Sequence, residues 1–146
     1  MYEHAGGEAA LLRLAHAHHA RCLADPELNH PFSHGGHPQH LERLAAYWGE
    51  VLGGPATYSG SLSNQTDLLV MHAGNGDMSD LGRRFVECFV AAANDAGLPD
   101  DADFRDVLRA YMEWAMASFI GYPEGVERVP QGLEVPRWGW DGLVTQ

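Results

Sequence analysis

The chain has 146 residues, of which 45% are hydrophobic, and this length and composition predict one globular domain around a single core. Its formal net charge of -11 argues against binding to nucleic acid or to an anionic membrane surface. All nine basic residues are arginine, which excludes chemistry that needs a lysine, such as Schiff-base catalysis. The sequence shows neither a secretory signal nor a membrane-spanning stretch, so we expect a cytoplasmic protein.

Two long helices are predicted in the first third of the chain. The first covers about residues 8–24 and ends at Asp25-Pro26, because the residue before a proline is disfavoured in helical geometry. An irregular link at residues 29–37 separates it from the second helix, about residues 38–52, which ends at Gly53-Gly54-Pro55. The inward faces at helical spacing are Leu11, Leu12, Ala15, His19, Cys22 and Leu23, then Leu41, Leu44, Trp48, Val51 and Leu52.

A short apolar helix follows in the middle of the chain. Residues 56–65 are rich in serine and glycine and predict a loop. Residues 66–72 predict the short helix, which ends on His72, and residues 74–76 predict a glycine turn. The other eight histidines all lie in the first forty residues, so His72 stands alone.

Two further long helices complete the pattern. The third covers about residues 80–96, with Ser79 as its expected cap and Gly97 as its left-handed end. The fourth covers about residues 101–120. Their expected inward faces are Leu81, Phe85, Cys88, Phe89 and Ala92, then Phe104, Val107, Leu108, Tyr111, Met112, Ala115 and Phe119.

The helical pattern fails after residue 120. We therefore expect a helical domain over residues 1–122 and an extension over residues 123–146 that packs on this domain or on a partner. Trp138 and Trp140 in the extension are expected to be exposed, which suits a contact between subunits of a homo-oligomer as well as a tail folded back on its own domain. Cys22 and Cys88 lie on apolar helix faces and are expected to be buried free thiols.

The histidines leave three interpretations open. They are incidental to a packed helical domain, or they bind zinc through two pairs at helical spacing, His16 with His19 and His37 with His40. In the third interpretation, the isolated His72 binds a haem iron in an apolar pocket. Carboxylates that would complete a metal site with the histidine pairs are missing from those helix faces.

One stretch carries a family resemblance. ERLAAYWGEVLGGPATYS, residues 42–59, resembles the second group of truncated haemoglobins, whose sequences share G-G-P-x-x-Y-[ST]. In that family a histidine follows about nineteen residues after the first of these glycines, as His72 follows Gly53 here. The segments ADPEL (residues 24–28) and AGL (residues 96–98) also have counterparts in the family.

The resemblance implies an all-α fold, the truncated globin two-over-two helical sandwich, in which His72 is the proximal ligand of haem b. It also implies binding of oxygen, nitric oxide or carbon monoxide at the iron. Nitric oxide dioxygenation and peroxidase-like turnover would both need an external reductant, so the resemblance does not decide whether the protein is an enzyme. The alternative from another class is a globin fold that has lost haem and serves as an interaction or sensor module.

Further site residues follow from the same resemblance. His19 stands where the family has a distal tyrosine, and His40 lies at the position above the iron, where it either donates a hydrogen bond to bound ligand or binds the iron itself. Phe85 replaces a tryptophan typical of the group. The apolar walls of the pocket are expected from Phe32, Leu44, Trp48, Val70 and Phe85.

The haem propionates define the last group of expected residues. Arg43 and Tyr58 match family positions that reach the propionates, and a guanidinium suits a carboxylate through its forked donors. Met71 stands where an arginine commonly precedes the proximal histidine, so one propionate contact is expected to be lost.

Overall fold

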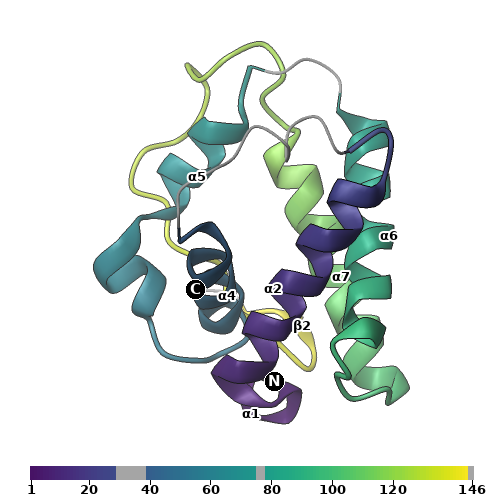
Figure 1. The fold of residues 1–146 in the computed structure, drawn as a ribbon. Coiled ribbons are helices and arrows are strands. Elements are labelled where there is room, and N and C mark those ends of the chain that lie inside the picture. The colour runs from purple at the N-terminus through teal and green to yellow at the C-terminus, as the bar shows by residue number, and fades with distance from the viewer. Residues whose placement is uncertain (29–38, 75–77, 145–146) are drawn as a thin grey trace.

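The computed structural model describes residues 1–28, 39–74 and 78–144. Its centre is made of helices α2 (Gly7–Ala24), α4 (His40–Val51), α6 (Ser79–Asp95) and α7 (Ala102–Phe119). Helix α2 packs on α4 and on α6, and α6 packs on α7 (Figure 1). This arrangement confirms the predicted two-layer helical sandwich. None of the helices in these ranges is both long and apolar enough to cross a bilayer.

The bounds of the predicted helices agree with the structure to within two residues, including α5 (Gln65–His72). Glycines end two of the long helices as expected, since Gly53 and Gly97 have φ angles of 98° and 70°, which side chains other than glycine rarely adopt. The prediction for Ser79 is wrong. It is the first residue of α6, and the cap position belongs to Met78, whose side chain makes no capping hydrogen bond.

Four small elements were not expected from the sequence. Helix α1 (Tyr2–Ala5) precedes α2, and the π-helical turn η1 (Tyr58–Leu62) lies inside the predicted loop. Strands β1 (Trp138–Gly139) and β2 (Gly142–Leu143) pair as an antiparallel hairpin in the extension. The expectation of a chain without strands is therefore wrong for this hairpin. Elsewhere in the described residues the elements are helical, and the hairpin lies outside the helical sandwich.

A buried carboxylate explains why η1 forms. Glu50, at the end of α4, is 2% exposed, and it accepts hydrogen bonds from the backbone nitrogen and the hydroxyl of Ser59, at 2.9 and 2.6 Å. A carboxylate that is removed from water requires such donors. Glu50 therefore ties the residues after Gly53-Gly54-Pro55 back onto α4.

The buried faces of two helices differ from the expected ones. On α2 the core contains His18 in place of His19, and Leu23 is 40% exposed rather than inward. On α6 the fully buried residues are Gly82, Val86, Phe89, Ala92 and Ala93. The expected Leu81, Phe85 and Cys88 are half-buried, so the buried face is shifted toward Gly82, Val86 and Ala93, while Phe89 and Ala92 lie in it as expected.

The extension packs along the helices. The hydroxyl of Thr66 on α5 donates to the carbonyl oxygen of Pro130 at 2.9 Å and accepts from the backbone nitrogen of Leu133 at 3.0 Å. Trp138 is 8% exposed, which corrects the expectation that it lies on the surface, and its ring packs on Tyr111 of α7. Trp140 is exposed at 46%. The extension thus runs past α5, and its hairpin packs against α7 (Figure 1).

Candidate functional site

His72 is held in a defined orientation at the end of α5. Asn64 begins this helix, since its side-chain oxygen accepts from the backbone nitrogen of Asp67 at 2.8 Å. The Nδ1 atom of His72 lies 2.7 Å from the carbonyl oxygen of Leu68, one turn earlier. A carbonyl oxygen can only accept, so Nδ1 carries the hydrogen, and in the neutral ring Nε2 carries the lone pair that can bind a metal.

The ring of His72 is also fixed by stacking. It lies parallel to the ring of Phe119 at the end of α7, with 4.7 Å between centroids and 14° between planes. His72 is half-buried, whereas Phe119 belongs to the core. The backbone of α5 and the side chain of α7 together determine how this imidazole is presented.

The structure brings the two expected distal histidines together. His19 on α2 and His40 at the start of α4 have ring centroids 6.2 Å apart, with an edge-on geometry of 64°. His19 is half-buried and His40 is exposed. Two imidazoles from neighbouring helices therefore share one side of the sandwich.

A third histidine, His18, was not singled out from the sequence. It is 1% exposed and packs edge-on against Phe85 at 4.2 Å. Its Nε2 atom donates to the carbonyl oxygen of Phe85 at 3.3 Å and lies 3.5 Å from the sulfur of Cys22. Burial lowers the pKa of His18 to about 4, so the ring is neutral at pH 7.

The residues expected to form the apolar walls differ widely in exposure. Trp48 is buried and packs on Phe89, with 5.0 Å between centroids, so it is part of the helical core. Leu44 and Phe85 are half-buried. Val70 is exposed, and Met71 is 69% exposed on the outer face of α5. Phe32, like His34 and His37, lies outside the described residues.

The two expected propionate partners are placed differently. Arg43 on α4 is half-buried, and its guanidinium donates to the carbonyl oxygen of Leu62 at 3.3 Å. Tyr58 is buried, and its ring lies edge-on to Tyr47 with centroids 5.0 Å apart. Arg43 therefore stands nearer to solvent than Tyr58 does.

The zinc interpretation finds no support in the residues that the structure describes. Within them, no group of three or more histidine, cysteine or acidic side chains is placed to hold a metal ion. His16 is exposed on α2, and His37 lies outside these residues. Both cysteines are free thiols as expected, although Cys88 is half-buried rather than buried.

A sandwich of α2, α4, α6 and α7, with a short helix that presents one histidine, is the architecture of a globin. Residues 1–115 match the model of the bacterial-like globin family, and the chain belongs to that family. No curated protein sequence matches the chain. Membership of the second group of truncated haemoglobins remains a prediction from the motif at residues 42–59.

Two solved structures are similar to this chain. One is a thermostable hemoglobin from the actinobacterium Thermobifida fusca, with 28% identity and a TM-score of 0.67 over 84% of this chain and 98% of that chain. The other is the hemoglobin of the thermophilic phototrophic bacterium Chloroflexus aurantiacus, with 30% identity and a TM-score of 0.67 over 82% and 95% of the two chains.

Proposed function

We propose that this globin binds haem b through Nε2 of His72 and takes up a diatomic gas at the iron on the side of His19 and His40. The observation that carries the proposal is the 2.7 Å contact between His72 Nδ1 and the carbonyl oxygen of Leu68. Histidines that bind metals commonly donate their other ring hydrogen to such an acceptor, which fixes the tautomer and the ring orientation. Two similar structures are of hemoglobins, which also supports the proposal.

The iron of the haem supplies the coordination position for the gas, and the chain supplies its surroundings. A ring N–H of His19 or His40 would donate a hydrogen bond to the bound gas, and such a bond contributes about 1 kcal/mol. His40 begins α4 and is exposed, so it can turn without repacking the core. In the alternative, His40 would itself bind the iron.

Non-covalent haem b fits the other residues of the chain. Cys22 and Cys88 lie on the facing helices α2 and α6, far from the C-x-x-C-H pattern that attaches haem covalently. Arg43 would pair with a propionate, because its planar guanidinium can donate two parallel hydrogen bonds to a carboxylate. Tyr58 is the second partner that the family resemblance implies. Reversible oxygen binding, nitric oxide dioxygenation and peroxide turnover are the reactions open to such a site, and sustained turnover requires an external reductant.

Haem titration followed by visible absorption tests this proposal. We expect the wild-type chain to develop an intense Soret band that saturates at one haem per chain. His72→Ala should abolish or displace this band, whereas His16→Ala should not, because His16 is an exposed histidine on α2. The same Soret titration in His72→Ala and in the wild type would contradict ligation by His72.

A haem-free interaction or sensor module is the second candidate. It is favoured by the surface of α5, where Met71 is 69% exposed at the position that carries an arginine in the resembling family. If the folded protein acquires no Soret band after haem supplementation, the result favours the haem-free module over gas binding.

A further inference from the structure

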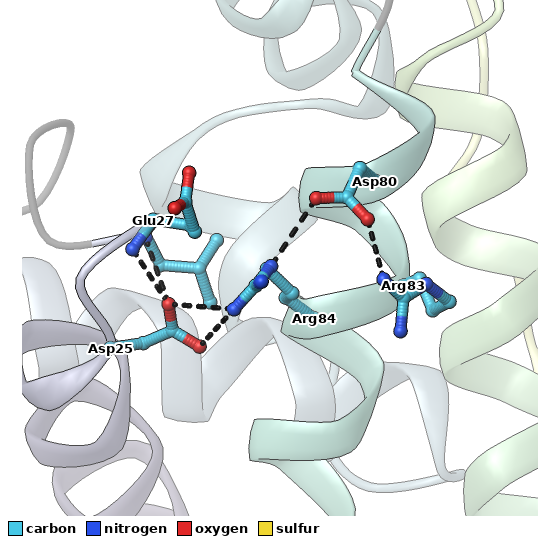
Figure 2. A network of polar contacts seen from close by, with 6 residues as sticks. Asp25, Glu27, Asp80, Arg83 and Arg84 are labelled. Carbon is cyan, nitrogen blue, oxygen red and sulfur yellow. Dashed lines mark hydrogen bonds and ion pairs between the residues drawn. The ribbon is translucent and has the colours of Figure 1, made fainter.

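The antiparallel contact between α2 and α6 brings the two cysteines of the chain to the same level. At one end of the contact, Arg13 donates to the carbonyl oxygen of Ala96 at 3.2 Å. At the other end, the guanidinium of Arg84 lies 3.4 Å from the carboxylate of Asp25 (Figure 2). Cys22 and Cys88 fall between these two contacts in nearly matching register.

Contacts around the two sulfur atoms agree with this register. Cys22 Sγ lies 3.5 Å from Nε2 of His18, and that nitrogen reaches the carbonyl oxygen of Phe85, one turn before Cys88 on α6. Cys22 and Cys88 also lie near enough for each thiol to shift the pKa of the other. Both are reduced, and they differ in access, because Cys22 is buried and Cys88 is half-buried.

We propose that Cys22 and Cys88 form an oxidisable pair, in which a peroxide converts the two thiols into a disulfide that links α2 to α6. The Cys88 thiolate attacks a peroxide oxygen, so that an S–O bond forms, the O–O bond breaks and water leaves after protonation. Cys22 then attacks the sulfenic sulfur, so that the S–S bond forms and a second water leaves. The two thiols lose two electrons and two protons, and one hydrogen peroxide is reduced to two water molecules.

The surroundings of the pair determine the order of these steps. Burial raises the pKa of Cys22 far above its usual range, so this thiol is a poor first nucleophile. Burial and the carboxylate of Asp25 raise the pKa of Cys88 as well, but Arg21 and Arg84 oppose that rise with their positive charge. Cys88 is also the more accessible sulfur, so it reacts first, more slowly than an unhindered cysteine.

Peptide mapping of the full chain after peroxide treatment tests the pair. Trypsin cuts after arginine, which places Cys22 in the peptide of residues 22–43 and Cys88 in the peptide of residues 85–105. We expect a cross-linked product of these two peptides, with the mass of the intact chain lowered by two hydrogen atoms. Reduction with dithiothreitol should restore both separate peptides.

Cys88→Ser is the matched control, since a half-buried serine at this position is compatible with the fold. It should yield no cross-linked peptide, and its thermal midpoint should be unchanged by peroxide, whereas the midpoint of the wild-type chain should rise on oxidation and return on reduction. Three results would overturn the proposal: an unmodified chain, oxygen adducts on Cys88 beside an intact Cys22 thiol, or disulfides between two chains. None of these readouts requires haem. A failure of the disulfide proposal can therefore be distinguished from a failure of the haem proposal, which the Soret titration tests.

Discussion

The helical sandwich and the α5 side of the molecule are held together in different ways. In the sandwich, stripes of apolar residues on α2, α4, α6 and α7 meet and exclude water from residues such as Trp48, Phe89 and Tyr111. On the α5 side, a short helix is attached to α7 and to the extension by a few defined contacts. These are the stacking of His72 on Phe119 and the two hydrogen bonds of Thr66.

The comparison separates what stabilises the fold from what presents the candidate ligand. His18 lies in the sandwich, with its ring nitrogen directed to Phe85 and Cys22, and its role is packing. His72 lies on the α5 side, where Nδ1 is directed to the backbone and Nε2 carries the lone pair. Two histidines of one chain thus acquire different roles from their hydrogen bonds and their burial.

Trp48→Ala should have the largest effect on stability. Trp48 is buried between Phe89 and His18, so its truncation removes apolar contacts and leaves a cavity, at a cost of about 4 kcal/mol in the free energy of unfolding. Met71→Ala on the α5 side should cost less than about 0.5 kcal/mol, because Met71 is mostly exposed. Urea unfolding measures both free energies. Equal losses of stability in the two variants would contradict the view that the sandwich, and not the α5 side, stabilises the fold.

Acid should weaken the sandwich through His18. Burial lowers its pKa from the usual 6.5 to about 4 in the folded chain, so between these values the unfolded chain binds a proton that the folded chain does not bind. Stability should therefore fall by about 3 kcal/mol as the pH drops from 6.5 to 4, with no further loss from this group below that. Urea unfolding at several pH values measures the loss.

His18→Phe should remove this contribution, because phenylalanine does not titrate and fills a similar space. His16→Gln is the control, since His16 is exposed and its loss should leave the pH dependence unchanged. A pH profile of His18→Phe that parallels the wild-type profile would show that another group is responsible.

Thr66→Val should loosen the extension without opening the sandwich. The substitution keeps the shape of the side chain but removes one donor and one acceptor that bind Pro130 and Leu133, at a cost of about 2 kcal/mol. Trypsin should cut after Arg128 and Arg137 faster in the variant, which time-resolved mass spectrometry can follow. Thr57→Val, at an exposed position, should be cut at the wild-type rate.

Arg84→Ala should have a smaller effect than the substitutions above. Arg84 pairs both with Asp80 on its own helix and with Asp25, directly after the end of α2. Its neighbour Arg83 pairs with Asp80 and makes no ion pair to α2 in Figure 2. We expect Arg84→Ala to lower the thermal midpoint slightly, by an amount that disappears at high salt, and Arg83→Ala to lower it less. Thermal unfolding at two salt concentrations distinguishes the variants, and equal shifts would show that the pair with Asp25 adds nothing.

The sequence predicts the sandwich well because its helices are long and amphipathic. On α2, however, the expected face included His19 rather than His18 as the inward histidine. The stripe of Leu11, Leu14, His18 and Cys22 carries the missing signal, since these residues recur at intervals of three and four.

The α5 side is harder to predict because its contacts join irregular segments. The η1 turn depends on Glu50, a buried carboxylate that a hydropathy pattern assigns to solvent. The hairpin carries a usable signal, the Asp141-Gly142 pair, in which Gly142 has a φ angle of 103°. The spacing from Gly53 to His72 singles out the candidate ligand, but the contacts of His72 with Leu68 and Phe119 could come only from the structure.

Rescue of a His72→Gly variant by free imidazole tests the central claim most directly. The glycine removes the proposed ligand and leaves room for an imidazole molecule beside Phe119. If His72 binds the iron, the variant should lose the wild-type ferrous haem spectrum, and added imidazole should restore it. A wild-type spectrum in the variant without imidazole would contradict the account.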